Sequence, residues 1–191
     1  MVESDRMPPI AVENQTPEQR RASEAFRTGR KEDVFGPFVP LLRSPEVMLR
    51  AMAMGDYLRF RTVLPRKLNE LVILVTARQW SQEYEWFVHY PLAVKEGLDP
   101  AIARDVAEGR RPADMDADEQ LVYDFSTELL RSQRVSDATY ARAVARFGEQ
   151  GTIDMTSVAG FYTFMAMVLN TARTPLPPGV SLALSPLDSG L

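Results

Sequence analysis

The 191-residue chain contains no cysteine. This absence excludes disulfide bonds, thiolate metal ligands and thiol-based peroxidase chemistry carried out by the chain's own side chains. Histidine is nearly absent as well, since His89 is the only one. A zinc site usually takes several His or Cys ligands. We therefore expect no metal and no cofactor in this protein.

Positive charge is also in short supply: 22 Lys and Arg face 26 Asp and Glu, for a net charge of −4. This balance argues against a nucleic-acid partner. No apolar run approaches the roughly 18 residues of a membrane span, so we expect no membrane association. The N-terminus lacks a cationic segment followed by a hydrophobic one, so it does not predict a secretory signal. We expect a cytoplasmic protein.

What is abundant is apolar material, 45% of all residues, which suffices for a sizeable core. Convincing strand alternation is missing, and about seven or eight helical segments predict an all-α fold with a single domain. We place an N-terminal arm at residues 1–16, the helical domain at 17–174 and a Pro-rich tail at 175–191. The tail cannot be helical and can wrap a neighbouring subunit.

Helix-start signals occur where Thr, Asp or Ser precedes a helical pattern, at Thr16, Ser44, Asp99, Asp116 and Ser136. Between the first two helices, residues 36–45 contain several prolines, which predict an irregular apolar segment that is buried or lines a pocket. Residues 152–172 are apolar on nearly all sides. Such a helix lies at the centre of a bundle or in an oligomer interface.

The most informative stretch is Leu64–Gly97. Its first half reads as a Pro-started buried helix; a buried strand is the alternative, but the segment continues well beyond strand length. The second half predicts a helix from about Ser81, the expected N-cap, to Glu96. On this helix one face carries Gln82, Glu85 and His89. If the two helices pack antiparallel, Glu70 on the first can lie near that face.

The order and spacing of these residues resemble a known pattern. Glu70 is followed by eleven residues and Gln82, two residues and Glu85, and three residues and His89. This resembles the active-site pattern of the carboxymuconolactone decarboxylase and alkyl hydroperoxidase D-like superfamily. In its peroxidase branch the positions of Gln82 and Glu85 are the cysteines of Cys-x-x-Cys. The segments RMPPI, GPFVPLLRSPEV and YEWFVHYPLA also look like a Cys-free branch, and the resemblance covers nearly the whole chain.

The resemblance implies an alkyl hydroperoxidase D-like helical bundle that forms a homo-oligomer, a dimer, trimer or hexamer, with the active site walled partly by a neighbour. It implies a lyase-like enzyme of aromatic compound breakdown that decarboxylates or isomerises a small carboxylated lactone or cyclic unsaturated acid. The peroxidase activity of Cys-containing relatives does not carry over. The alternative is a non-catalytic oligomer of the same fold that binds a small acid or a partner protein.

Three catalytic candidates follow. We assign His89 as general acid/base, because its pKa lies near neutrality; the plainer interpretation is a buried histidine bonded to the backbone. Glu85 either favours the imidazolium or, in an apolar pocket, acts as the proton donor itself; it could also be a solvated carboxylate. Glu70 is either a relay to His89 or a structural ion-pair partner of Arg66, Lys67 or Arg78.

Substrate-binding candidates are weaker. Gln82 can bind only by hydrogen bonds. An arginine is the better clamp for a substrate carboxylate, and we take Arg78 from the four nearest in sequence. These four are Arg59, Arg61, Arg66 and Arg78. Possible pocket walls are aromatic, although each fits a core position equally well: Phe38, Tyr57, Trp86 and Tyr90.

Overall fold

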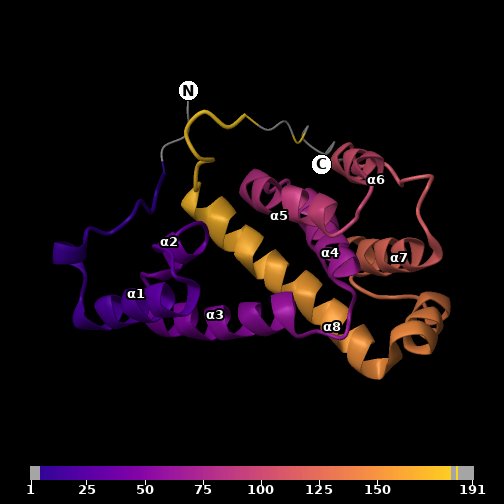
Figure 1. Ribbon diagram of the computed structural model, residues 1–191, viewed down its shortest axis with the longest axis horizontal. Helices are drawn as coiled ribbons and strands as arrows, with labels where there is room; N and C mark the ends of the chain where they lie inside the picture. Colours follow the sequence, from indigo (N-terminus) through magenta and orange to yellow (C-terminus); the bar gives the residue numbers. More distant parts are fainter. Residues whose placement is uncertain (1–4, 182–183, 185–191) are drawn as a thin grey trace.

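The computed structural model describes residues 5–181 and 184 (Figure 1). Within these residues the chain is helical and has no strand, which confirms the all-α prediction. The elements are η1 (Val12–Asn14), α1 (Pro17–Arg30), α2 (Phe38–Leu41), α3 (Pro45–Phe60), α4 (Arg66–Gln79), α5 (Glu83–Lys95), α6 (Pro100–Ala107), α7 (Ala117–Ser132) and α8 (Asp137–Ala172).

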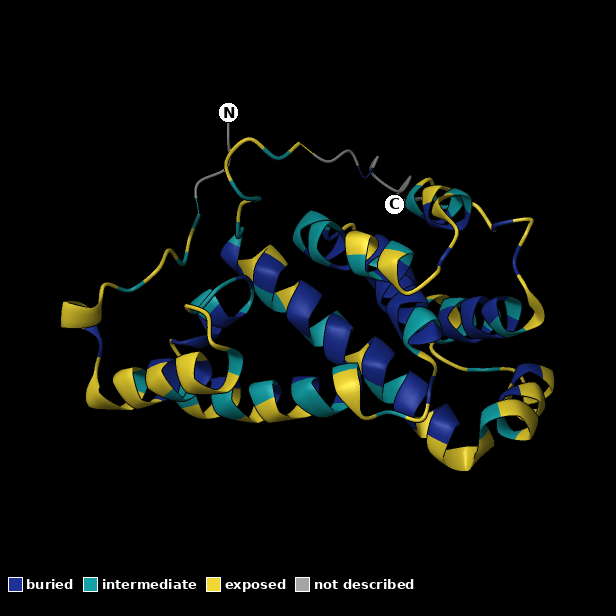
Figure 2. Ribbon diagram, in the orientation of Figure 1, coloured by how far each residue is buried: buried dark blue, intermediate teal, exposed yellow. Residues whose placement is uncertain are grey.

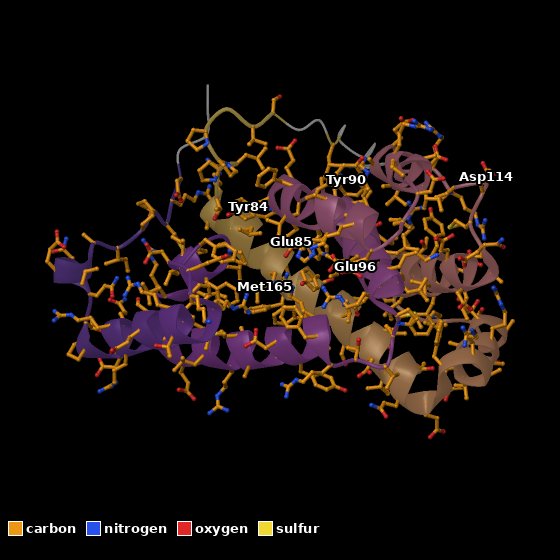
Figure 3. The ribbon with its side chains drawn as sticks, in the orientation of Figure 1. Tyr84, Glu85, Tyr90, Glu96, Asp114 and Met165 are labelled. Atoms are coloured by element: carbon orange, nitrogen blue, oxygen red, sulfur yellow. The ribbon has the colours of Figure 1, made fainter. Side chains whose placement is uncertain are left out.

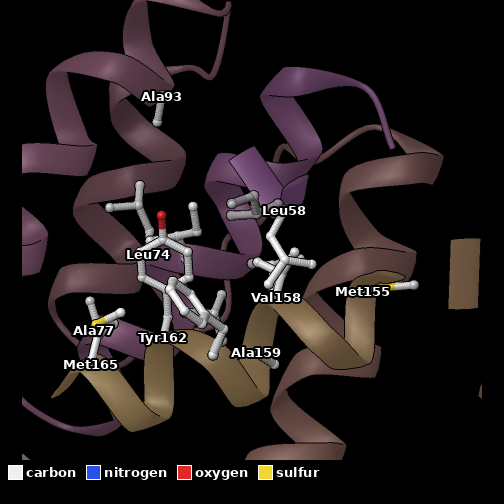
Figure 4. Packing of buried hydrophobic residues seen from close by; sticks show 14 of the residues in the cluster. Leu58, Leu74, Ala77, Ala93, Met155, Val158, Ala159, Tyr162 and Met165 are labelled. Carbon is white, nitrogen blue, oxygen red and sulfur yellow. The ribbon is translucent and has the colours of Figure 1, made fainter. Parts of the chain in front are cut away.

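Helix α4 forms the middle of the core. Every residue from Leu68 to Arg78 is buried, because the helix packs against α5, α7 and α8. The apolar run LVILVTA is therefore a helix enclosed on all sides, and the strand alternative is wrong. Figure 4 shows Leu74 of α4 close to Leu58 of α3 and Tyr162 of α8, where the three helices meet.

Helix α8 crosses the centre of the molecule, and much of its surface is buried (Figures 1 and 2). It bends at Gly148, whose φ of 69° is a backbone conformation that glycine adopts without strain. Gly148 is the one described residue of α8 with non-helical dihedral angles, and Gly151 already belongs to the next helical stretch.

By length and composition α8 is long and apolar enough to cross a membrane, although polar residues interrupt its apolar stretches. Within the bundle, 56% of its most apolar window is buried. More than half of this window is thus covered by its own neighbours, α4, α7, α3 and α2, as expected for a core helix, while Ile153 and Met167 remain exposed.

Four of the predicted helix starts are confirmed. The side chains of Thr16, Asp99, Asp116 and Ser136 each accept a backbone hydrogen bond from the first turn of their helix. Ser44 directly precedes α3, as predicted, but its side chain makes no capping hydrogen bond. Ser81 is not the N-cap of α5. It has a positive φ of 46°, which turns the chain back between α4 and α5, and the following residue takes the capping position.

The arm runs along the surface and is fixed at two points. The Arg6 amide donates to the Ala172 carbonyl at 2.8 Å, and the Arg43 guanidinium donates to the Pro8 carbonyl at 2.8 Å. The segment 36–45, expected to be irregular, contains the short helix α2, because its apolar side chains pack inward. Residues 175–181 of the tail are not helical, while 182–183 and 185–191 lie outside the described residues.

Candidate active site

Glu70 and His89 form a buried pair between neighbouring helices. The His89 Nδ1 lies 2.7 Å from Glu70 Oε2, and the two residues are 5% and 0% exposed. A carboxylate accepts the Nδ1–H of a neutral imidazole and so fixes its tautomer. The Nε2 atom of His89 then keeps its lone pair.

His89 also borders a small, partly enclosed cavity of about 50 Å³. Since Nδ1 faces Glu70, Nε2 is the nitrogen left for this cavity. The walls come from α1, α3, α5, α8 and the α2 segment: Arg30, Pro37, Phe38, Gly55, Arg59, Tyr84, Glu85, Val88, His89, Phe161, Tyr162 and Met165. The volume holds a few water molecules. A ligand of several heavier atoms requires wall side chains to move.

Glu85 lines the same cavity, one helical turn before His89. It is 3% exposed, and its Oε2 is a buried oxygen without a hydrogen-bond partner. Burial raises the pKa of the Glu85 carboxyl well above its ordinary value. Figure 3 shows Glu85 in the interior of the molecule, between α5 and α8. Burial therefore favours the carboxylic acid form of this residue, which can donate a proton.

The surroundings of His89 shift its pKa in the opposite direction, downward. Burial lowers the pKa of the imidazole; the bond to Glu70 acts against this, and the positive charges of Arg59 and Arg66 add to the lowering. We take the imidazole as neutral at pH 7. Burial thus acts on the two groups in opposite directions, favouring the unprotonated base at His89 and the protonated acid at Glu85.

Tyr162 is a wall residue that sequence reasoning missed. Its ring meets the His89 ring edge-on, with centroids 4.9 Å apart, and burial raises the pKa of its hydroxyl, which stays protonated. The available signal was its position in the apolar stretch 152–172, because a tyrosine at the centre of a bundle needs a polar neighbour.

Two guanidinium groups border the cavity, those of Arg30 and Arg59. The first pairs with Asp56 at 2.8 Å and lies over the Phe38 ring. Sequence reasoning missed Arg30, since α1 is distant along the chain, and named Arg59 only as one of four nearby arginines. In the part of the chain that the structure describes, no three His, Asp or Glu side chains are grouped to hold a metal ion.

Of the predicted substrate-binding residues, Phe38 lines the cavity. Gln82 does not: it caps α5 by accepting from the Tyr84 amide at 2.7 Å, and its Nε2 donates to Asn170 Oδ1 at 2.7 Å. Gln82 therefore does not share the face of Glu85 and His89 as predicted. It is the N-cap residue and precedes the first turn of α5, which begins at Glu83.

The other four candidates lie away from the cavity walls. The Tyr57 hydroxyl donates to Asp154 at 3.1 Å, and the Trp86 ring stacks on Tyr90. Arg78 borders a different hollow, beside α7, where its guanidinium donates to Ser81 Oγ at 3.5 Å. Proximity in sequence thus did not identify the arginine at the cavity.

No protein-family model matches the chain, and no curated protein matches it by sequence. Two solved structures share its architecture. An uncharacterized peroxidase-related protein from Ralstonia eutropha JMP134, described as an alkylhydroperoxidase AhpD core, aligns with a TM-score of 0.73 and 18% identity over 91% of this chain and 92% of that one. An uncharacterized peroxidase-related protein from Silicibacter sp. TM1040 aligns with a TM-score of 0.68 and 18% identity over 87% of each. The chain therefore has an AhpD-like all-α fold.

Proposed function

We propose that the protein is an enzyme that moves protons, without redox chemistry, on a small carboxylated lactone or cyclic unsaturated acid. The reaction is an isomerisation or a decarboxylation. One observation carries the proposal: His89 and the buried carboxyl of Glu85, whose Oε2 has no hydrogen-bond partner, border one partly enclosed cavity. A buried carboxyl oxygen without a partner costs free energy of folding, and here it lies beside a histidine at the cavity wall.

In an isomerisation His89 Nε2 takes a proton from a carbon next to a carbonyl. The electron pair of that C–H bond enters the conjugated system, and Glu85 gives its proton to a different carbon. The imidazolium that forms is stabilised by Glu70 at 2.7 Å. Exchange with water then returns the proton from His89 and restores Glu85.

In a decarboxylation the electron pair of the C–C bond enters the conjugated system as carbon dioxide leaves. Glu85 protonates the resulting dienolate at carbon and regains a proton from water. The barrier falls because cationic and hydroxyl groups in the cavity wall stabilise the developing oxyanion. Arg59 and Tyr162 are the wall residues that supply these groups.

The AhpD-like fold supports a catalytic role but does not bring the neighbours' chemistry with it. Both neighbours are described as peroxidase-related. This chain has Gln82 and Glu85 at the spacing where the peroxidase branch has its two cysteines, and no thiol elsewhere. Proton transfer is the chemistry that its remaining residues support.

The test is deuterium incorporation from D₂O into a panel of small carboxylated lactones and cyclic unsaturated acids, followed by NMR. Exchange catalysed by the wild type and abolished in His89→Gln and Glu85→Gln supports the proposal. Exchange that persists in both variants overturns it. Binding of panel members without any exchange by the wild type supports the non-catalytic alternative.

A further inference from the structure

The two arginines at the cavity wall differ in whether a carboxylate pairs with them. Arg30 is neutralised by Asp56, with a 2.8 Å ion pair. Arg59 has no such partner: no described carboxylate lies within ion-pair distance, its buried Nε has no hydrogen-bond partner, and its guanidinium lies 5.1 Å from the centre of the Phe60 ring. The cavity wall therefore carries one cation without a paired anion among the described residues.

The acids nearby do not supply the missing partner. Glu85 makes no ion pair with Arg59, and burial raises its pKa, which favours the neutral form. Glu70 stands behind His89, bonded to Nδ1, and does not line the cavity. An arginine beside a shielded cavity favours an anion, and its planar fork matches the two oxygens of a carboxylate.

We propose that Arg59 binds a carboxylate of the substrate, and that this carboxylate is retained in the product. The proposal rests on the proton-transfer function above. A carboxylate that leaves as carbon dioxide loses its charge on the way to the transition state. An ion pair with Arg59 would then stabilise the ground state more than the transition state and slow the reaction.

The substrate class follows from this role. A monocarboxylic acid held by Arg59 is isomerised, with its carboxyl carbon kept. Decarboxylation is confined to substrates that carry a second carboxylate, placed away from Arg59. Neutral lactones and esters lack the group that Arg59 binds and are poor ligands.

The test compares binding of 2-furoate with that of its neutral isostere 2-furamide, followed through the imidazole NMR signals of the only histidine. The wild type is expected to prefer the acid by about tenfold or more, the usual size of a charged hydrogen bond. In Arg59→Gln this preference disappears. Arg61→Gln is the matched control, because Arg61 is exposed, lies over the Tyr57 ring and does not line the cavity.

Equal binding of acid and amide by the wild type, or an undiminished preference in Arg59→Gln, overturns the proposal. Arg59→Met, whose apolar stem can still cover Phe60, replaces the Gln variant if that variant does not fold. Release of labelled carbon dioxide from a ¹³C-carboxyl monoacid also overturns it. A preference that depends on Arg59 while the wild type catalyses no deuterium exchange leaves the anion site standing and contradicts only the proton-transfer function.

Discussion

Two regions of the molecule treat charge in opposite ways. On the outer side of α7 and α8, carboxylates and cations meet one another: Arg146 makes two bonds of 2.7 Å to Asp118, and Asp124 pairs with both Arg111 and Arg142. Around the cavity, buried polar atoms on Arg59 and Glu85 have no partner. In the first region the charged groups form ion pairs within the chain. In the second region the unpartnered polar atoms remain available to a ligand.

The difference shows which charges are available for chemistry. Surface pairs such as Arg146–Asp118 lie in water and add little to stability. A buried acid without a partner costs free energy of folding, which a protein tolerates where the group has a task. The predictions below test this division, from the largest expected effect to the smallest.

Replacing the base should have the largest effect. His89→Gln is expected to slow deuterium exchange by about 10²–10⁴-fold, the usual contribution of a general base. Gln82→Ala is the control, because Gln82 has the matching sequence spacing but caps α5 away from the cavity. Its rate per folded molecule should stay that of the wild type, and an equal loss in both variants would mean that the cavity is not the reaction site.

Replacing the acid should separate activity from stability. The folded-state pKa of Glu85 lies above its ordinary value of 4.5, so the folded protein keeps a proton that the unfolded chain loses as pH rises. Stability from this group is thus present at low pH and is lost above pH 4.5. Glu85→Gln removes this pH-dependent loss of stability. The variant should therefore unfold at a higher temperature than the wild type at pH 7, by roughly 2–4 °C per kcal/mol gained in free energy of unfolding.

The same variant should lose catalysis, since an amide cannot donate the proton in this way. Thermal unfolding at pH 4 and pH 8 checks the stability claim. The difference between Glu85→Gln and the wild type should grow with pH. A difference that shrinks as pH rises would show that Glu85 is ionised and stabilising in the folded state.

A smaller effect is expected at the cavity wall. Gly36 has a φ of 55°, and a Cβ there would lie 2.9 Å from the Tyr84 ring. Gly36→Ala should therefore cost about 1–2 kcal/mol of stability and displace Tyr84. The matched control is Gly29→Ala in α1, where a Cβ meets nothing within 4 Å and should be neutral or slightly stabilising. Urea unfolding of both variants measures the contrast.

The smallest effect is expected in the paired region. Arg146→Ala removes the two-bond contact with Asp118. The arginine side chain is 55% exposed and the aspartate side chain 29%, so the loss of stability should be smaller than that of Gly36→Ala. Activity should be unchanged. A loss of stability as large as that of Gly36→Ala would mean that the surface pairs matter more than their exposure suggests.

Local sequence signals predicted the helices well. The caps at Thr16 and Asp116 depend on residues three positions apart, which are visible in the sequence. The prediction that Ser81 caps α5 was wrong. In the sequence, a serine in a left-handed tight turn cannot be told from a serine at an N-cap. The short helix α2 was missed because prolines within a few residues usually prevent one.

The site was predictable only in part, because local spacing along one helix does not show how different helices pack. Glu85 and His89 are one helical turn apart, so their common face follows from the periodicity of α5. The Glu70 contact and the position of Arg59 depend on how α3, α4 and α5 pack, which spacing along the chain does not give. Arg78, chosen by proximity in sequence, borders a different hollow for that reason.

The central claim is that His89 is a neutral base with its free nitrogen toward the cavity. A pH titration of the imidazole by two-bond ¹H–¹⁵N NMR tests it directly, because the chain has one histidine and its signals need no assignment. We predict a pKa below the ordinary 6.5, and a neutral form with the proton on Nδ1. A pKa above 6.5, or a neutral form protonated on Nε2, would contradict the account.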